Sequence, residues 1–319
     1  MADLHDRAVL VTGGSASPRP RHEHHPGLRC SRPAEPYDAS VTTVAEPEDV
    51  LAPVPPRRLI VTVYGLYARE RGGALSVAAL VRLLGDLGVD GQAVRSAVSR
   101  LKRRGLLEPQ KVGGAAGYRL SAAAADVLAE GDERIFSRRR AGAGEGWLLV
   151  AFSVPESARD KRHQLRSLLI RLGLGTVAPG LWVAPAHLEA EISHALERAG
   201  LRGYTELFRS RHVAGRALPD TVASWWDLDA LDAQYTAFLD RHEPVLRAWQ
   251  ESDGTPAQAF ADFVTLVTVW RRLPYLDPGL PLEGLPRDWV GGRAEELFGD
   301  LRARLAGPAR EHVTTVLDG

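Results

Sequence analysis

The chain has 319 residues, of which 45% are hydrophobic and 25% charged, and its formal net charge is zero. This composition is typical of a globular protein with two or three domains, and no apolar run is long enough to span a bilayer. The single cysteine, Cys30, excludes an internal disulfide, and the N-terminus lacks the basic and then apolar pattern of a secretory signal. We therefore expect a cytoplasmic protein.

The charge is distributed unevenly along the chain. Residues 57–140 hold 16 Lys and Arg against 8 Asp and Glu, whereas residues 1–56 hold 5 against 8 and residues 141–319 hold 19 against 24. A basic segment within a neutral chain is a candidate for contact with phosphate groups. A solvated basic face would give the same count, so charge alone leaves both interpretations open.

The first 56 residues differ from the rest. Residues 1–56 are rich in Pro, Arg, His, Glu and Ser, which predicts a disordered extension because little apolar surface is available to offset chain entropy. Residues 7–17 (RAVLVTGGSAS) look like the strand and Gly-rich turn of a dinucleotide site, but prolines follow where the helix should begin. The cluster His22, His24 and His25 could bind a metal weakly, yet a His-rich tail is the simpler interpretation. We expect no cofactor and no metal.

Folded structure is predicted from residue 57 onward. The expected elements are a helix over 57–69, a helix capped by Ser76, a helix capped by Asp90, strands over 107–112 and 117–121 around a Gly-rich tip, and a short helix over 122–136 capped by Ser121. Three helices followed by a basic hairpin predict a winged helix-turn-helix domain over residues 57–140.

The third of these helices separates apolar from polar residues. Its apolar side chains recur with the helical period and face the core, while the opposite side holds Gln, Ser and Arg without any acid. Gln pairs with adenine and Arg with guanine, and Ser serves base or phosphate. Because a merely solvated helix usually mixes both signs of charge, this face favours DNA binding. The side chains expected to contact DNA are Gln92, Arg95, Ser96, Ser99, Arg100 and Arg103 on the helix and Lys111, Tyr118 and Arg119 on the hairpin.

Residues 141–215 predict a ferredoxin-like βαββαβ domain. The pattern gives a strand over 146–154, a helix over 158–172, two short strands within 175–185, a helix over 186–199 and a strand over 204–213. A metal nuclease of this architecture needs a carboxylate where the first strand ends. That place reads FSVP, and the nearby Glu156 falls at a helix start, so nuclease activity is disfavoured.

Residues 216–319 predict a helical domain. Helical spacing covers 221–250, a further helix and a Pro-rich loop fill 255–292, and a final helix is expected over 293–305. The aromatic residues here could line an effector pocket with arginines as anion partners, or they could simply pack the helices together. The candidate effector-binding residues are Trp225, Trp226, Tyr235, Arg271, Arg272 and Tyr275.

Residues 57–319 resemble the PaaX family, transcriptional repressors of bacterial phenylacetic acid degradation. The resemblance lies in the stretches LGVDGQAVRSAVSRLKRRGLLE, VAPGLWVAP, WWDLDALDAQYTAFLDRHEPVL and RRLPYLDPGLP, which follow one another in the family's order. It implies a homodimeric winged-helix repressor of a catabolic operon that binds partly palindromic double-stranded DNA operators. It also implies release by an aryl-acetyl-CoA thioester, with phenylacetyl-CoA as the family default. On this likeness the recognition helix uses Gln92, Arg95, Ser96, Ser99 and Arg103.

Two departures from the family pattern bear on function. Residues 1–56 lie outside it, and Thr268 and Val269 stand where we expect a His and an acid before the Trp-Arg-Arg run. If those groups bind the effector in relatives, a different ligand follows here. The interpretation we favour is a DNA-binding repressor that is not an enzyme. The alternatives are an enzyme (a reductase using residues 7–17 or a nuclease) and an interaction adaptor that has lost DNA binding.

Overall fold

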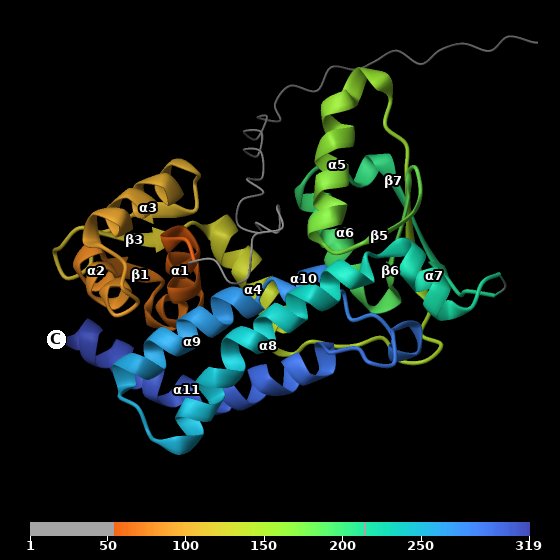
Figure 1. The fold of residues 1–319 in the computed structure, drawn as a ribbon. Coiled ribbons are helices and arrows are strands. Elements are labelled where there is room, and N and C mark those ends of the chain that lie inside the picture. The colour runs from red at the N-terminus through yellow and green to blue at the C-terminus, as the bar shows by residue number, and fades with distance from the viewer. Residues whose placement is uncertain (1–53, 214) are drawn as a thin grey trace, which may run out of the picture. The chain divides into compact units, whose positions relative to one another are not determined.

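The computed structural model describes residues 54–213 and 215–319 (Figure 1). The Gly-rich stretch over 7–17, the histidine cluster, Cys30 and nearly all of the expected extension over 1–56 lie outside the described residues. These described residues belong to one compact unit. None of the described helices combines the length and the apolar character needed to cross a bilayer. We refer below to the N-terminal part (54–140), the central part (141–213) and the helical part (215–319).

The N-terminal part contains the predicted helices. They are α1 (Pro56–Val63), continued by η2 (Tyr64–Ala68) and η3 (Arg69–Arg71), then α2 (Val77–Gly85), α3 (Gly91–Arg103) and α4 (Ala122–Phe136). The predicted caps are confirmed. The side chain of Ser76 accepts a hydrogen bond from the N–H of Ala79 at 3.1 Å, and that of Asp90 accepts one from Gln92 at 2.7 Å. Ser121 caps α4 in the same way. Each satisfies an amide that a helix start leaves unpaired.

A three-stranded sheet accompanies these helices. Its strands are β1 (Ala74–Ser76), β2 (Leu107–Pro109) and β3 (Gly117–Leu120), in the order β1-β3-β2, all antiparallel. The predicted hairpin is confirmed, although β2 is shorter than expected and only a bridge between Val112 and Ala115 continues it. The tip residues Gly113 and Gly114 have φ of 55° and 83°, which suits a two-residue hairpin loop. β1 was not predicted, because three residues are too few to show an alternating pattern.

The central part has the predicted order of elements. They are β4 (Trp147–Phe152), η4 (Glu156–Ala158), α5 (Arg159–Arg171), β5 (Gly175–Ala178), β6 (Leu181–Pro185), η5 (Ala186–Leu188), α6 (Glu189–Arg198), η6 (Arg202–Tyr204) and β7 (Thr205–Ser210). The sheet order is β5-β6-β4-β7, antiparallel throughout. Alternate residues of β4 face opposite sides. Val150 packs with α5 and α6, whereas Trp147 packs with Val222 and Trp226 of the helical part.

The helical part differs from expectation at two points. Its elements are α7 (Leu218–Trp225), α8 (Leu228–Glu251), α9 (Pro256–Trp270), α10 (Leu273–Leu276), η7 (Leu282–Gly284) and α11 (Gly291–Asp318). The stretch expected to be helical over 221–250 breaks at Trp226, which is extended, because the Asp227 side chain caps a new helix by accepting from the N–H of Ala230 at 2.9 Å. The final helix, expected over 293–305, continues past Pro308 because Ala309 and Val313 are buried in the core.

The N-terminal and helical parts share one hydrophobic core. α9 lies against α1, and α11 lies against both α9 and α2 (Figure 1). The rings of Tyr67 and Phe260 are 5.8 Å apart between centroids. The Thr268 hydroxyl lies 2.7 Å from that of Thr62 and 2.6 Å from the carbonyl of Val264, which satisfies these groups inside the core. The N-terminal part is therefore built onto the helical part.

Candidate functional site

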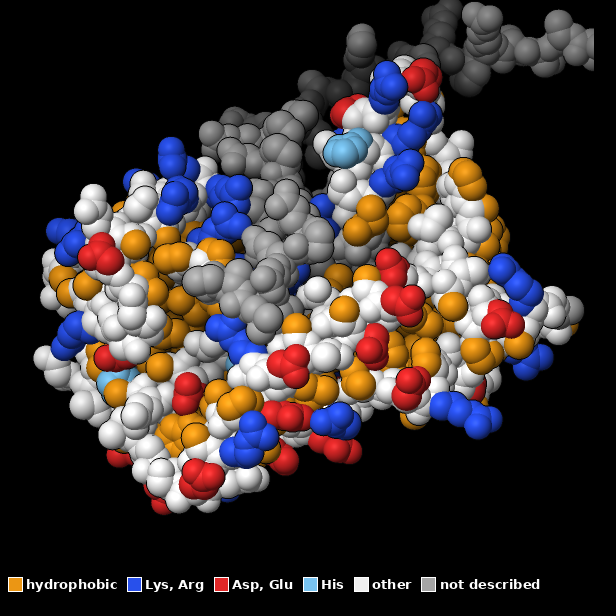
Figure 2. Space-filling view, in the orientation of Figure 1, with side chains coloured by type: hydrophobic (Ala, Val, Ile, Leu, Met, Phe, Trp, Pro, Cys, Tyr) orange, Lys and Arg blue, Asp and Glu red, His pale blue; other side chains and the backbone are white. Residues whose placement is uncertain are grey.

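The polar face of α3 is formed as its spacing predicts. Val94, Ala97, Val98 and Leu101 are buried on the inner side. The six expected side chains, Gln92, Arg95, Ser96, Ser99, Arg100 and Arg103, are all exposed. Positions 92, 96, 99 and 103 follow one another at three- and four-residue steps, so they share one face of the helix. Figure 2 shows Lys and Arg side chains gathered over the region where α3 lies.

The hairpin offers a more mixed surface. Lys111 is exposed near its tip, and Tyr118 is half-buried with its carbonyl accepting a hydrogen bond from the hydroxyl of Tyr64 at 2.8 Å. Arg119 lies across from Glu108 and forms an ion pair with it at 2.7 Å. This pair is solvent-exposed and worth at most about 1 kcal/mol, so a phosphate could displace Glu108.

The six candidate effector residues do not form one site. Tyr235 is fully buried, where its hydroxyl donates to the Asp277 carboxylate at 3.0 Å and accepts from Arg138 at 2.7 Å. Trp226 packs against Trp147 at 6.0 Å between ring centroids. Its indole N–H donates to the carbonyl of Gly173 at 2.9 Å. Tyr235 therefore lies inside the core, whereas Trp226 is mostly buried by packing and also lines the second pocket described below.

The carboxylate of Asp277 is the centre of a buried charged cluster. Arg138 and Arg140 pair with it, and Arg140 also contacts Glu295 at 2.7 Å. Backbone N–H groups of Gly279 and Leu280 donate to its other oxygen, at 3.0 and 3.1 Å. Burial alone would raise the pKa of Asp277, but the two guanidinium groups and these hydrogen bonds lower it to about 2. The cluster joins the segment after α4 to the loop before α11.

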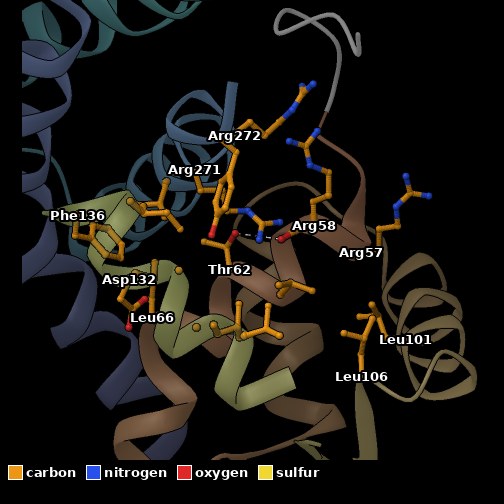
Figure 3. Close-up of a pocket in the computed structure, with 18 of the residues that line it drawn as sticks. Arg57, Arg58, Thr62, Leu66, Leu101, Leu106, Asp132, Phe136, Arg271 and Arg272 are labelled. Carbon is orange, nitrogen blue, oxygen red and sulfur yellow. Dashed lines mark hydrogen bonds between the residues drawn. The ribbon is translucent and has the colours of Figure 1, made fainter. Parts of the chain in front are cut away.

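Arg271, Arg272 and Tyr275 do come together, at a pocket between the N-terminal and helical parts. Its volume is about 90 Å³. It is lined by α1, the end of α3, α4, the end of α9 and the segment that follows. Three further arginines line it: Arg57, Arg58 and Arg104. In Figure 3 the labelled arginines lie toward one end of the pocket, and Leu66, Leu101 and Leu106 lie toward the other.

Sequence reasoning missed these three further arginines as pocket residues. Arg57 and Arg58 lie in the first turn of α1, and Arg104 directly follows α3. All three are far in sequence from Arg271 and reach the same pocket only through the tertiary fold. The adjacent pair at 57–58 was the one available sequence signal. Thr268, which departs from the family pattern, lies directly behind Thr62 of the pocket wall.

A second pocket lies between the central and helical parts. Trp225, Trp226, Gln234, Arg272 and Tyr275 line it, and its volume is about 430 Å³. Arg272 and Tyr275 thus border both pockets, whereas Arg271 borders only the first and Trp225 only the second. The second pocket is wider and holds one arginine.

The described residues hold no group of three or more His, Cys, Asp and Glu side chains suited to a metal ion. At the end of β4, Glu156 begins η4 and lies 3.3 Å from Arg162. This is the placement that the sequence predicts for it.

Family models match most of the described chain. Residues 56–124 match the model described as PaaX-like protein, residues 140–222 that of the PaaX protein central Cas2-like domain, and residues 226–315 that of the PaaX-like protein C-terminal domain. The three matches follow one another without overlap. They correspond in order to the N-terminal, central and helical parts of the structure, although the second match extends to residue 222, into the helical part.

Two individual proteins resemble the chain over most of its length. The transcriptional repressor PaaX of Escherichia coli (strain K12) is 28% identical over 269 residues, which cover 82% of this chain and 84% of that protein. The solved structure of uncharacterized protein Rv0674 from Mycobacterium tuberculosis has a TM-score of 0.47 at 22% identity, and it covers 78% of this chain and 99% of that one. With three successive segments matched in order, this protein belongs to the PaaX family.

Proposed function

We propose that this protein is a DNA-binding transcriptional repressor of a catabolic operon without catalytic chemistry, acting in the cytoplasm. The observation that carries the proposal is the face of α3, where six exposed side chains able to contact bases or phosphates stand together with no acid among them. The similarity to the repressor PaaX supports the same function. In this proposal the N-terminal part is a winged helix-turn-helix domain, and the hairpin of β2 and β3 is its wing, which brings Lys111, Tyr118 and Arg119 to the DNA backbone.

The proposed assembly is a homodimer on a partly palindromic operator. Two copies of α3 would enter successive major grooves on one side of the duplex, about 34 Å apart. The central part, with its ferredoxin-like order of strands and helices, and the helical part would hold the two copies at this spacing. An aryl-acetyl-CoA thioester, phenylacetyl-CoA in the first instance, is the proposed effector that releases the protein from DNA.

Fluorescence anisotropy tests this function directly. The protein is titrated onto the DNA upstream of its own coding sequence and onto a scrambled duplex, between about 50 and 200 mM salt. We expect selective binding that weakens steeply with salt, because phosphate contacts release counterions. Weak binding without salt dependence would support the adaptor alternative instead, and metal-dependent cleavage of either duplex would support the nuclease.

Two variants distinguish a contact with a specific base from a general electrostatic contribution to DNA binding. Arg103→Ala should reduce the ratio of specific to non-specific affinity by about 5- to 100-fold if Arg103 contacts a base. Arg293→Ala is the matched control, because it removes the same charge from an exposed arginine of α11 that pairs with Glu243 at 2.8 Å. An unchanged ratio in Arg103→Ala would reject the base contact.

A further inference from the structure

The arginine-lined pocket borders the element that would contact DNA. Leu101 belongs to α3 itself, and Arg104 and Leu106 lie in the turn between α3 and β2. The walls that face them come from α1, α4 and the end of α9. A molecule that enters this pocket therefore touches the C-terminal end of α3 from its inner side, while the opposite face of the helix stays exposed.

The pocket has the electrostatic character of an anion site. Five arginines line it, and among the described lining residues the only carboxylate is Asp132, which forms an ion pair with Arg69 at 2.6 Å. Burial, and the neighbouring charges of Arg58 and Arg272, lower the pKa of Arg271 to about 10. Arg271 is thus still charged at neutral pH, but it is held among like charges, and an anion beside it would relieve their repulsion.

The whole pocket is smaller than an enclosed cavity that holds an aromatic ring. Leu66, Leu101 and Leu106 line it together with Leu128 and Ile135 of α4. The volume is about 90 Å³, whereas a cavity that holds benzene measures roughly 150 Å³. An aromatic or similar apolar group can therefore be enclosed completely only if one wall moves outward.

The walls of the pocket opposite α3 are tied to their surroundings by polar contacts. α1 and α9 are joined by the buried contact of Thr62 with Thr268. α4 is anchored by Arg134, whose guanidinium donates to the carbonyls of Pro274 at 3.0 Å and Leu172 at 2.7 Å. At the end of α3 the pocket is lined by Leu101, Arg104 and Leu106, and the carbonyl of Leu106 accepts a hydrogen bond from the N–H of Ser121 at 3.0 Å. The chain then turns through a left-handed glycine at position 105.

We propose that this pocket is the effector site, that it binds an amphipathic organic anion, and that ligand entry displaces the C-terminal end of α3 and so lowers DNA affinity. Carboxylate or phosphate oxygens of the ligand bind to Arg104 and Arg271, and its apolar group enters between α1 and α4. The ligand acts through its different affinity for the two positions of α3. This mechanism rests on the proposed DNA-binding function but operates within a single copy of the chain.

Calorimetry without DNA tests the site. Full-length protein is titrated with phenylacetyl-CoA, with CoA and with phenylacetate. Arg271→Gln and the exposed Arg104→Gln are each expected to weaken phenylacetyl-CoA binding about 10- to 100-fold, the size expected for a lost charged hydrogen bond. Arg293→Gln, the matched surface control, should bind as the unmodified protein does. Trp225→Leu, which alters only the second pocket, should also retain this affinity within about twofold.

The results separate this inference from the function on which it rests. Selective operator binding by the unliganded protein tests the function, whereas the calorimetry tests only the pocket. Comparison of the three probes tells which part of the ligand provides the anion. The assignment fails if both arginine variants bind phenylacetyl-CoA normally, if Trp225→Leu alone abolishes binding, or if the folded protein binds none of the three.

Hydrogen exchange tests the displacement. Amides near the end of α3 and in residues 104–106 should exchange faster when the ligand is bound, while those of α1 and α9 should be protected. In Arg104→Gln, at the same ligand concentration, the ligand-induced change in exchange rate should be smaller, because less of the variant is bound. Protection that appears only around α7 and α8 would move the effector to the second pocket and overturn the proposal.

Discussion

Single buried polar residues hold this fold together at places where the sequence shows no special pattern. The carboxylate of Asp277 receives two guanidinium groups, a phenol and two backbone amides, although its neighbours in sequence are Leu276 and Pro278. The ionised form is strongly favoured there because every contact is a donor. A buried carboxylate with these partners is costly to alter, since its removal leaves buried cations without compensation.

Replacing Asp277 with Asn should destabilise the protein by about 3–5 kcal/mol, because Arg138 and Arg140 would keep their charges without the carboxylate. Urea unfolding of the variant measures this loss, with Asp229→Asn on the exposed side of α8 as the control. The pKa of about 2 lies below the ordinary 3.8. The ionised carboxylate therefore contributes its full stability above pH 3.8, and the contribution is lost as pH falls toward 2. Equal stability of the two variants would show that the cluster contributes little.

His242 should make stability fall at mildly acidic pH. Burial beside the Phe238 ring, and the charge of Arg241, lower the pKa of His242 from 6.5 to about 3. Between these values the unfolded chain binds a proton that the folded protein excludes, so the free energy of unfolding falls by about 1.4 kcal/mol per pH unit as pH decreases from 6.5. His242→Phe should flatten this slope, as urea unfolding between pH 7.5 and 5 would measure. His163→Gln, which alters an exposed histidine, is the control and should keep the unmodified slope. If His242→Phe shows the same slope as this control, His242 is not the cause of the pH dependence.

At the scale of elements, the turn after α5 fixes the central part against the helical part. Gly173 has φ of 81°, and a Cβ at this position would lie 2.2 Å from the carbonyl oxygen of Tyr275. Its own carbonyl accepts the hydrogen bond from Trp226. Only a residue without a side chain permits this close approach, so Gly173 places α10 and the start of α8 against the central sheet.

Gly173→Ala should therefore cost more than the usual price of a left-handed alanine, about 1 kcal/mol. Gly200→Ala is a matched control, because Gly200 has φ of 64° and a Cβ there would meet nothing within 4 Å. Thermal unfolding of the two variants separates the two effects. Gly200→Ala introduces backbone strain alone, whereas Gly173→Ala adds the clash with the Tyr275 carbonyl. Similar melting temperatures would show that the Tyr275 backbone moves aside easily.

The elements show which features local sequence can predict. The caps at Ser76, Asp90 and Ser121 and the polar face of α3 depend on neighbours within a few turns, and they were predicted correctly. β1 was missed because its pairing partner, β3, is about forty residues away along the chain. Of the residues that line the arginine-lined pocket, Arg271, Arg272 and Tyr275 were candidates from the sequence. The arginines of α1 and of the end of α3 were missed, because helical spacing on α9 says nothing about which residues of other helices will face it.

At the scale of the whole molecule, the N-terminal part depends on the helical part. Its core residues pack with those of α9 and α11, and salt bridges such as Arg71 to Asp318 at 2.8 Å join the surfaces. The side chain of Arg82 donates to the carbonyl of Val316 at 2.7 Å. Separation of the two parts would expose apolar surface that costs about 25 cal/mol per Å².

A fragment of residues 54–140 should consequently lack the stability of the same residues in the full chain. Circular dichroism during urea unfolding should show a broad transition or a midpoint well below that of residues 54–319, since the fragment loses the packing of Tyr67 and Val63 against the helical part. Wild-type stability of the fragment would show that its own helices and sheet form a sufficient core. Operator binding by such a stable fragment would further show that the helical part is dispensable for DNA contact.

The shared core has an evolutionary consequence. A regulator whose DNA-binding and sensing domains are joined only by a linker can exchange one of them by recombination at the linker. A crossover near residue 140 in this chain would pair the Tyr67 and Thr62 of one parent with the Phe260 and Thr268 of another. Such hybrids inherit mismatched halves of one interior, so a crossover at this position should lower the stability of the product. For the same reason, changes to the exposed side chains of α3 should disturb this interior less than exchange of the whole N-terminal part.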